Sequence, residues 1–353
     1  MISLEEVARK PGEWLRGAGP LHEIVISTRV RLARNIAGFV FLTRADAETR
    51  TEIADTIQAA IRKSPALAHL IHLDLEQLDE LDRQLLVERH LISRQHAEGT
   101  GARRVAFDAQ EVAALMINEE DHLRIQVIRS GFQIDEAWTQ INSIDDELEA
   151  RVEYAFDAKY GYLTACPTNV GTGLRVSVML HLPALRLINE LDKVVQAAKD
   201  LQLAIRGVHG EGTETEGDLF QISNQITLGQ SESEIIEGFR DDIVPRIVEY
   251  EQAARQTLLK HRLAALDDKV WRALGMLQNA RLISSHEAMQ YLSHVRMGLH
   301  TGRLKTVDLQ TLNELFLQTQ PAHLQKLQGE RLSGEQRSIA RAALIRARLH
   351  NHN

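Results

Sequence analysis

The chain has 353 residues, of which 44% are hydrophobic and 25% charged, with a formal net charge of −8 and one cysteine. This composition is typical of a folded protein with two domains and argues against disorder. The negative net charge argues against a protein whose main role is to coat nucleic acid or anionic lipid, because such a protein needs a strong basic field. The lone thiol of Cys166 excludes an internal disulfide framework and a zinc site built from several thiolates.

The first part of the chain predicts a mixed α+β domain. The opening stretch, residues 1–19, has no uninterrupted apolar run, so we expect neither a signal peptide nor a membrane span, and a cytoplasmic protein. Up to about residue 230, short β-branched or alternating runs are interleaved with helical stretches. Strands are expected near 23–28, 103–108, 123–128, 174–182, 204–210 and 219–229, and helices near 48–63 and 182–202.

Beyond residue 233 the strand signals stop, and the periodicity predicts a bundle of helices. The expected helices are 234–262, 266–280, 285–299, 308–320 and 333–349. Ser285 resembles a helix cap, and Ser333 with Gln336 resembles a capping box. We therefore divide the chain into a domain at 1–250 and a helical domain at 251–353.

Five arginines lie in or beside glycine-rich, polar or strand-end stretches of the first domain: Arg29, Arg31, Arg124, Arg175 and Arg206. A guanidinium group in a strand must find an anion or reach solvent, because its charge cannot be removed. Together the five predict a pocket for a polyanion such as a nucleoside triphosphate. No GxxxxGK[ST] is present, so the sequence does not indicate a P-loop. "GTGLRV" has only part of a dinucleotide fingerprint, so a Rossmann site is not indicated either.

The same motifs also contain carboxylates, namely Glu119, Glu120 and Asp121 in "NEEDHLR", and Glu211 and Glu214 in "HGEGTE". An acidic run alone is most often a solvated loop or helix start. Paired carboxylates can also act as a general base, bind a metal or hold a cation. The spacing of His209 and Glu211 does not match a zinc motif. An acceptor that is itself a guanidinium would fit two carboxylates and would need one of them to take its proton.

Four stretches, "STRVRLARN", "NEEDHLR", "CPTNVGTGLR" and "RGVHGEGTE", resemble in order and spacing the motifs of the phosphagen (ATP:guanido) kinases. Within that superfamily the chain resembles the bacterial protein-arginine kinases. It leaves no room for the N-terminal domain of the small-guanidine kinases, and it carries a helical C-terminal domain. The resemblance implies a catalytic α+β domain with a mainly antiparallel sheet flanked by helices, followed by an all-α domain.

The resemblance also implies roles for individual residues. Glu120 matches the catalytic base, Glu211 its partner on the acceptor guanidinium, and Cys166 a reactive thiol beside the acceptor. The matching nucleotide segments comprise Ser27, Thr28, Arg29, Val30, Arg31, His90, Arg124, Arg175, Val176, Ser177, Val178, Met179, Arg206, Gly207, Val208, His209, Gly210 and Glu211. Two alternatives stay open: Cys166 as a small buried hydrophobe, and His90 as a surface or core histidine. Mg²⁺ is expected, held mostly by phosphate oxygens and water.

One stretch departs from the family. Relatives carry RDxxRA in the C-terminal domain, which binds phosphoarginine allosterically, whereas this chain has "RSIARA". Arg337, Arg341 and Ala342 agree, but Ser338 replaces the aspartate. A hydroxyl cannot pair with a guanidinium through a full charge, so selectivity or coupling should weaken. The alternative is an exposed, basic final helix.

These observations predict transfer of the γ-phosphoryl group of ATP to arginine residues in proteins. A kinase of free arginine or another small guanidine is the alternative within the same chemistry, and a non-catalytic adaptor is the alternative of another class. The resemblance further implies a Clp-type AAA+ protease, a heat-shock repressor and a zinc-containing activator as partners, and a homodimer formed through the helical domain. No direct contact with nucleic acid or membrane is expected.

Overall fold

The computed structural model describes residues 4–207 and 216–350 of the chain. Val208, His209, Gly210 and Glu211 of the expected site, together with Glu214, lie outside the described residues.

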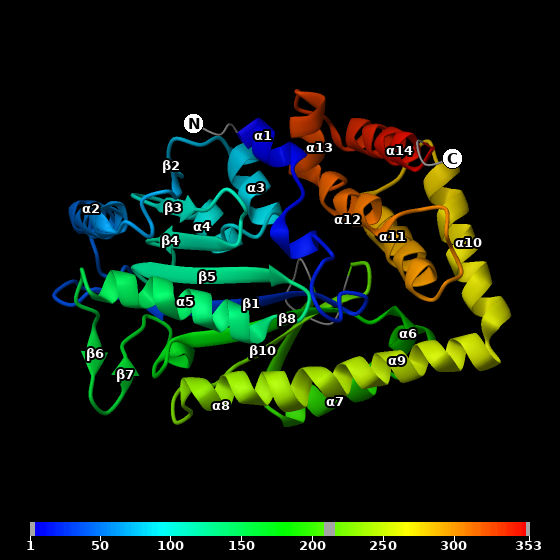
Figure 1. Ribbon diagram of the computed structural model, residues 1–353. Helices are drawn as coiled ribbons and strands as arrows, with labels where there is room; N and C mark the ends of the chain where they lie inside the picture. The colour runs from blue at the N-terminus through cyan, green and yellow to red at the C-terminus, as the bar shows by residue number, and fades with distance from the viewer. Residues whose placement is uncertain (1–3, 208–215, 351–353) are drawn as a thin grey trace.

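An eight-stranded sheet forms the centre of the first part of the molecule (Figure 1), and every neighbouring pair of its strands is antiparallel. The order is β2-β3-β4-β5-β1-β8-β10-β9. The strands are β1 (Val25–Arg34), β2 (Ile71–Asp74), β3 (Arg104–Phe107), β4 (Ala113–Ile117), β5 (Leu123–Ser130), β8 (Leu174–His181), β9 (Leu203–Gly207) and β10 (Leu219–Asn224). A separate short hairpin pairs β6 (Phe156–Asp157) with β7 (Gly161–Tyr162).

Helix α5 (Ile134–Glu149) packs along β1 and β5 on one face of the sheet. Its apolar side chains Ile141 and Leu148 are fully buried, because they meet the side chains that β1 and β5 direct to that face. The other helices of this part are α1 (Leu4–Arg9), α2 (Ala47–Lys63), α3 (Glu80–Glu88), α4 (Arg94–Glu98), α6 (Pro183–Leu187) and α7 (Leu191–Asp200). The helix expected at 182–202 is thus two helices, broken where Asn189 takes a φ of 61°.

One long helical run lies along the lower edge of the first part and continues into the second (Figure 1). It comprises α8 (Glu232–Glu237), a π-helical turn (Gly238–Ile243) and α9 (Val244–His261). The expected boundary between 250 and 251 falls inside α9, and the main hydrophobic core runs from the sheet into the C-terminal helices. The division into two domains at that position stays a prediction.

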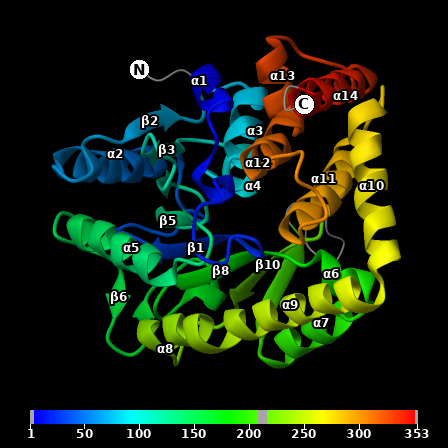
Figure 2. The ribbon, with the colours of Figure 1, turned by 45° about the vertical axis from the view of Figure 1, so that its right-hand side comes forward.

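The remaining helices form the expected C-terminal all-α region (Figure 2). They are α10 (Leu263–Asn279), α11 (Ser285–His300), α12 (Leu309–Gln318), α13 (Pro321–Gln328) and α14 (Gly334–His350). The capping box at the start of α11 uses Ser284 with Glu287, so the expectation that Ser285 is the cap was wrong by one residue. At α14 the backbone N–H of Ser333 donates to Gln336 and the N–H of Gln336 to the Ser333 hydroxyl, as expected for a capping box.

Burial holds one histidine of the first part neutral. His96 is fully buried, and its Nε2 lies 3.0 Å from the carbonyl oxygen of Ile117. Because a carbonyl can only accept, Nε2 carries the proton. Burial lowers the pKa of His96 to about 4 in the folded chain. In the unfolded chain the imidazole has its ordinary pKa of about 6.5, so between these two values the unfolded chain binds a proton that the folded chain does not. This contribution to stability is complete above pH 6.5 and declines as the pH falls toward 4.

We expect His96→Gln to flatten the acid side of the stability profile. The glutamine amide can still donate to the Ile117 carbonyl but does not titrate. In urea unfolding, the wild-type free energy should fall between pH 7 and pH 5 by up to about 2 kcal/mol more than that of the variant. Equal losses in both proteins would show that His96 does not carry this pH dependence.

Candidate active site

The strand register gathers the five arginines on one face of the sheet. Across β1 and β8, Arg29 lies opposite Ser177, and Arg31 lies opposite Arg175. On the other side of β1, Ala33 lies opposite Arg124. Arg206 enters through β9, opposite Gln221 of β10. Directly paired residues point to the same face, so all five guanidinium groups project from the side opposite α5.

Three of these arginines lie half-buried close together, with other arginines as the main charges around them. Burial, followed by repulsion from neighbouring arginines, lowers the pKa of Arg29 and of Arg175 to about 10, and that of Arg31 well below its usual value. Among the described residues none of the three forms an ion pair with a carboxylate. The buried Nε atoms of Arg31 and Arg175 also have no hydrogen-bond partner. All three remain protonated near pH 7, so this face favours an anion with many oxygens.

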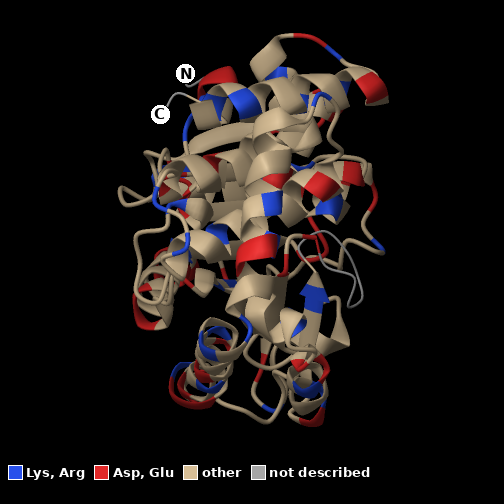
Figure 3. Ribbon diagram, turned by 90° about the vertical axis from the view of Figure 1, so that its right-hand side faces the viewer, with Lys and Arg blue, Asp and Glu red and all other residues tan. Residues whose placement is uncertain are grey.

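Charges elsewhere are mixed. In Figure 3, Lys and Arg are interspersed with Asp and Glu on the helices that this side presents. The positive charge of the arginine face is therefore local rather than a property of the whole surface.

A cavity of about 390 Å³ opens on the arginine face, and Glu119 and Glu120 are among its lining residues. Glu120, one-third exposed, accepts from Arg124 at 2.9 Å, and the buried Glu119 pairs with the same guanidinium at 2.7 Å. Ser93 donates to Glu119 from the start of α4. Burial raises the pKa of Glu119, but Arg124 and the Ser93 hydroxyl outweigh it, and the net pKa is lowered. Arg124 is thereby fixed beside Glu120, which lines the cavity.

Cys166 lines the same cavity, half-buried, with its Sγ 3.0 Å from the Thr168 hydroxyl. The wall that carries it is held by Asp121, which is completely buried. One oxygen of Asp121 accepts from the Asn35 amide and from the backbone N–H of Ala165, both at 2.7 Å. Asp121 therefore fixes the backbone next to Cys166. The third acid of "NEEDHLR" is a structural residue at the edge of the site, and not a solvated one.

A glycine in the "CPTNVGTGLR" motif allows a close contact near this wall. Gly171 has a φ of +112°, and a Cβ there would lie 2.7 Å from the Thr227 carbonyl oxygen. The chain between Cys166 and Arg175 can approach the 227–228 segment only because this position has no side chain.

A second, smaller pocket lies at the other end of the arginine face. Its apolar walls are Trp14, Ile128 and Met179, and its polar lining comprises Ser27, Arg29, His90, Ser177 and Gln221. The ring of His90 stands edge-on to Trp14, with 4.4 Å between the ring centroids. His90 thus lines a pocket next to Arg29. Its role in nucleotide binding stays a prediction, beside the alternative of a surface or core histidine.

Not all expected nucleotide residues reach this face with their side chains. Thr28, Val30, Val176 and Val178 are fully buried on the opposite face, because neighbouring positions of a strand alternate. The Thr28 hydroxyl donates to the carbonyl of Gly131 instead. Gly207 ends β9 opposite Phe220. These residues can shape the strands but cannot direct side chains toward the cavity.

The "RSIARA" stretch lies in α14 and contacts neighbouring segments of the helical region. Arg341 is buried and donates to the carbonyls of Thr319 at 2.7 Å and Ile283 at 3.0 Å, and Ala342 is buried beside it. Arg337 donates to the Leu332 carbonyl, and the Ser338 hydroxyl to that of Gly334. The picture of an exposed basic helix is wrong for Arg341, because its guanidinium joins helices together.

Several residues of the site were missed from the sequence. Trp14, Ser93 and Gln221 belong to no recognisable motif, and only the fold brings them to the arginine face or its walls. Asn35 ends the "STRVRLARN" motif, but nothing in that motif singled it out as a partner of Asp121. For Gln221 a signal existed, since it alternates with buried positions in β10. Trp14, in a single 3₁₀ turn (Glu13–Leu15), had none.

Among residues 4–207 and 216–350, no group of three His, Cys, Asp or Glu side chains could hold a metal ion. In the same residues no helix is long and apolar enough to cross a membrane.

Comparison with known proteins agrees with this geometry. Residues 52–254 match the family described as "ATP:guanido phosphotransferase, C-terminal catalytic domain", and residues 263–353 match "Protein-arginine kinase McsB C-terminal domain". A protein-arginine kinase from Halothermothrix orenii is 44% identical over 349 residues, and one from Pelotomaculum thermopropionicum is 46% identical over 354. Each alignment covers 99% of both chains.

Solved structures share the fold. The duplicated taurocyamine kinase from Schistosoma mansoni, with bound transition-state-analogue components, superposes with a TM-score of 0.60 and 26% identity. That match covers 67% of this chain and 34% of the duplicated one. Lombricine kinase superposes with a TM-score of 0.58 and 25% identity, covering 69% of this chain and 72% of that one.

An antiparallel sheet flanked by helices is the fold that this chain shares with these guanidino kinases, and the matched catalytic-domain family places it among the guanidino phosphotransferases. The expected fold class is thus confirmed. With relatives matching from end to end, the chain belongs to the protein-arginine kinase family.

Proposed function

We propose that this enzyme transfers the γ-phosphoryl group of ATP to a guanidinium nitrogen of arginine residues in proteins. The observation that carries the proposal is the cavity in which Arg31, Arg124 and Arg175 face Glu120 and Cys166. Fixed guanidinium groups stabilise the charge that spreads over a phosphoryl group in transfer, and a carboxylate beside them can take the proton of the acceptor.

In this mechanism the nucleoside lies at the end of the face with Trp14, His90 and Met179, and the phosphates run along the arginines toward the larger cavity. That direction is supported by Arg29, Arg31 and Arg175, whose half-buried guanidinium groups lie among other arginines and form no ion pair among the described residues. A polyphosphate would supply the anionic oxygens that these groups lack. Its binding therefore relieves repulsion already present in the folded protein.

The chemical step forms a bond between an acceptor nitrogen and the γ-phosphorus and breaks the bond from that phosphorus to the β–γ bridging oxygen, which leaves with ADP. Glu120 accepts the proton lost by the guanidinium nitrogen. Arg124, held on its other side by Glu119, orients the Glu120 carboxylate. In our proposal Cys166 helps to hold the acceptor cation. Glu211, which lies outside the described residues, is the second carboxylate that binds the acceptor guanidinium.

Mg²⁺ fits this site only as an ion carried by the nucleotide. Glu119 is committed to Arg124 and Ser93, and the described residues contain no metal-ligand cluster. Phosphate oxygens and water would supply most ligands. When bound, Mg²⁺ would neutralise phosphate charge.

A direct experiment separates the proposed acceptor from the alternative. The protein is incubated with ATP and Mg²⁺ together with either free arginine or an unfolded protein, and the products are searched by mass spectrometry for acid-labile phosphate on arginine. Label on the protein alone supports the proposal. Label on free arginine alone would identify a small-guanidine kinase. If no ATP were turned over with either acceptor, the alternative of a non-catalytic adaptor would be revived.

We further propose, from family likeness alone, that phosphoarginine marks substrates for a Clp-type AAA+ protease and inactivates a heat-shock repressor in the cytoplasm. A zinc-containing activator and a homodimer through the helical region belong to the same proposal. A first test is whether a purified Clp-type unfoldase and protease degrade a model protein faster after its incubation with this enzyme and ATP. Equal degradation rates would contradict the marking role.

Asp121→Ala should weaken the acceptor side of this reaction. The variant removes the acceptor of two buried hydrogen bonds and frees the backbone beside Cys166. We expect kcat/KM for a protein acceptor to fall about 10- to 100-fold, with little change in KM for ATP. Asp121→Asn keeps the accepting oxygen and should recover most of the activity. Equal losses in both variants would mean that the negative charge matters, and not the backbone contact.

A further inference from the structure

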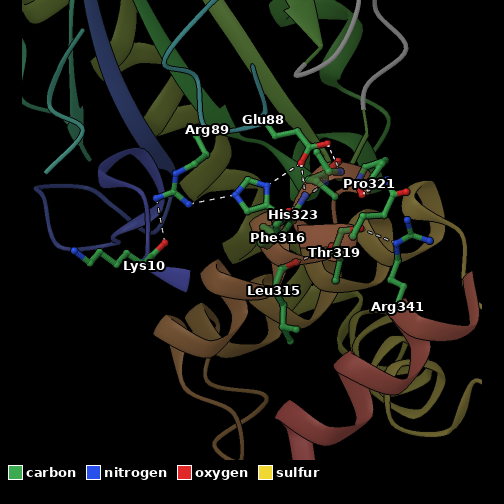
Figure 4. Close-up of polar contacts among 12 residues, drawn as sticks. Lys10, Glu88, Arg89, Leu315, Phe316, Thr319, Pro321, His323 and Arg341 are labelled. Carbon is green, nitrogen blue, oxygen red and sulfur yellow. Dashed lines mark hydrogen bonds and ion pairs between the residues drawn. The ribbon is translucent and has the colours of Figure 1, made fainter. Parts of the chain in front are cut away.

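Glu88, the last residue of α3, joins the sheet part of the molecule to the C-terminal helices (Figure 4). One of its oxygens accepts from the backbone N–H of Ala322 at 2.8 Å. The other accepts from the N–H of His323 at 3.0 Å and lies 2.7 Å from His323 Nδ1. A carboxylate there caps the first turn of α13 and opposes the positive end of its dipole. Both Glu88 and His323 are buried.

The protonation of His323 follows from its neighbours. Nε2 lies 3.2 Å from a guanidinium nitrogen of Arg89, which can only donate. Nε2 is therefore the acceptor, and the proton on Nδ1 is donated to Glu88. A neutral His323 thus connects Glu88 with Arg89 across the contact between α3 and α13.

Arg89 extends this connection to the segment that carries Trp14. It pairs with the buried Glu111 through Nε at 2.8 Å, and it donates to the carbonyl of Lys10 at 3.1 Å. Lys10 lies four residues before Trp14, whose ring packs against His90.

The next residue, His90, is fixed both by the turn and by the sheet. Its φ of 60° is a left-handed conformation, which is unfavourable for a histidine unless contacts on both sides hold it. Its carbonyl accepts from Gln126, which projects from β5 on the arginine face opposite Arg31. Three consecutive residues, 88 to 90, therefore connect the N-terminus of α13 with the smaller pocket.

The start of α13 is held from the other side as well. Arg341 of α14 donates to the carbonyl of Thr319, the C-cap of α12, two residues before α13 begins (Figure 4). The position of Glu88 thus depends on how α12, α13 and α14 pack together.

We propose that Glu88 and His323 are positioning residues through which the C-terminal helices hold His90 and Trp14 at the nucleoside end of the ATP site, and so set the affinity for nucleotide rather than the rate of phosphoryl transfer. The proposal rests on the nucleotide site proposed above. Neither residue touches the larger cavity, so neither takes part in the chemical step.

The test compares nucleotide binding and turnover in Glu88→Gln with those of the wild type. Glutamine keeps the size of the side chain but puts an amide against the donors of α13. Calorimetric titration with Mg²⁺ and ADP should give a dissociation constant raised about fivefold or more, whereas kcat at saturating ATP stays within about twofold. A residue with a purely structural role would lower the unfolding temperature without this separation of affinity from rate.

Asp82→Asn is a matched control, because Asp82 on α3 forms an ion pair with Lys326 of α13 at 2.5 Å, between the same two helices but away from residues 88 to 90. It should leave ADP affinity unchanged. Should Glu88→Gln not fold, His323→Asn decides the question, since its amide can still donate to Glu88 but no longer accepts from Arg89. It too should weaken ADP binding about fivefold.

Unchanged affinity in a folded Glu88→Gln or His323→Asn variant would overturn the proposal, as would an equal loss in Asp82→Asn. A wild-type protein that binds no ADP would instead contradict the nucleotide site itself.

Discussion

Glu120→Gln is expected to lower kcat by about 10²–10⁴ and to leave the dissociation constant for ADP nearly unchanged, because it removes a general base without removing any guanidinium group. The glutamine oxygen can still accept from Arg124, so the local geometry survives and only the capacity to take a proton is lost. Single-turnover phosphorylation of a model protein, measured beside calorimetric ADP binding, checks both halves of the prediction.

Glu98→Gln is the control for this experiment, since Glu98 is an exposed carboxylate at the end of α4. It should retain full turnover. Wild-type kcat in Glu120→Gln would remove the residue from the role of base, and a parallel loss of ADP affinity would indicate that the substitution had disturbed Arg124.

Arg175→Lys should lower kcat/KM for ATP by about 10²-fold. A lysine keeps a positive charge on β8 but has no planar fork, so it cannot hold two phosphate oxygens at once. It also loses the hydrogen bond that the guanidinium donates to the Ser223 hydroxyl at 2.9 Å. Steady-state kinetics with varied ATP, together with ADP titration, measure the effect.

Arg246→Lys makes the same chemical change on α9, where the arginine side chain is 70% exposed. It should leave kcat/KM for ATP and the affinity for ADP unchanged. If Arg175→Lys bound ADP and turned over like the wild type, Arg175 would have no part in phosphate binding.

Strand periodicity made the arginine face predictable. In β1, Arg29 and Arg31 alternate with Val30 and Leu32, and a strand with this pattern must place both arginines on one side. The same alternation places Arg34 on the opposite face, but it does not indicate which partner the guanidinium group finds there. Arg34 is buried, bonds to Asp145 of α5 at 2.6 Å and lies 3.6 Å from the ring centroid of Tyr162, so it holds the structure together.

Elements whose formation depends on distant neighbours were not predicted from the sequence. The strand β4 is uniformly buried and shows no alternation, β2 has only four residues, and α13 is a short helix whose start is capped by Glu88 from far along the chain. Trp14 reaches the smaller pocket for the same reason, since nothing near it in sequence indicates a pocket. Contacts of this kind are fixed by tertiary packing and leave no local pattern.

The helix α9 connects the two parts of the chain through buried polar contacts. Glu251 is completely buried and caps the first turn of α6 through the N–H groups of Ala184 and Leu185, and Arg255 pairs with it at 2.9 Å. Arg255 also donates to the carbonyl of Glu23, two residues before β1 starts. A chain shortened at residue 250 would lack both Glu251 and Arg255, and with them the cap of α6 and the contact to the segment before β1, so we expect such a fragment to be less stable than the full chain.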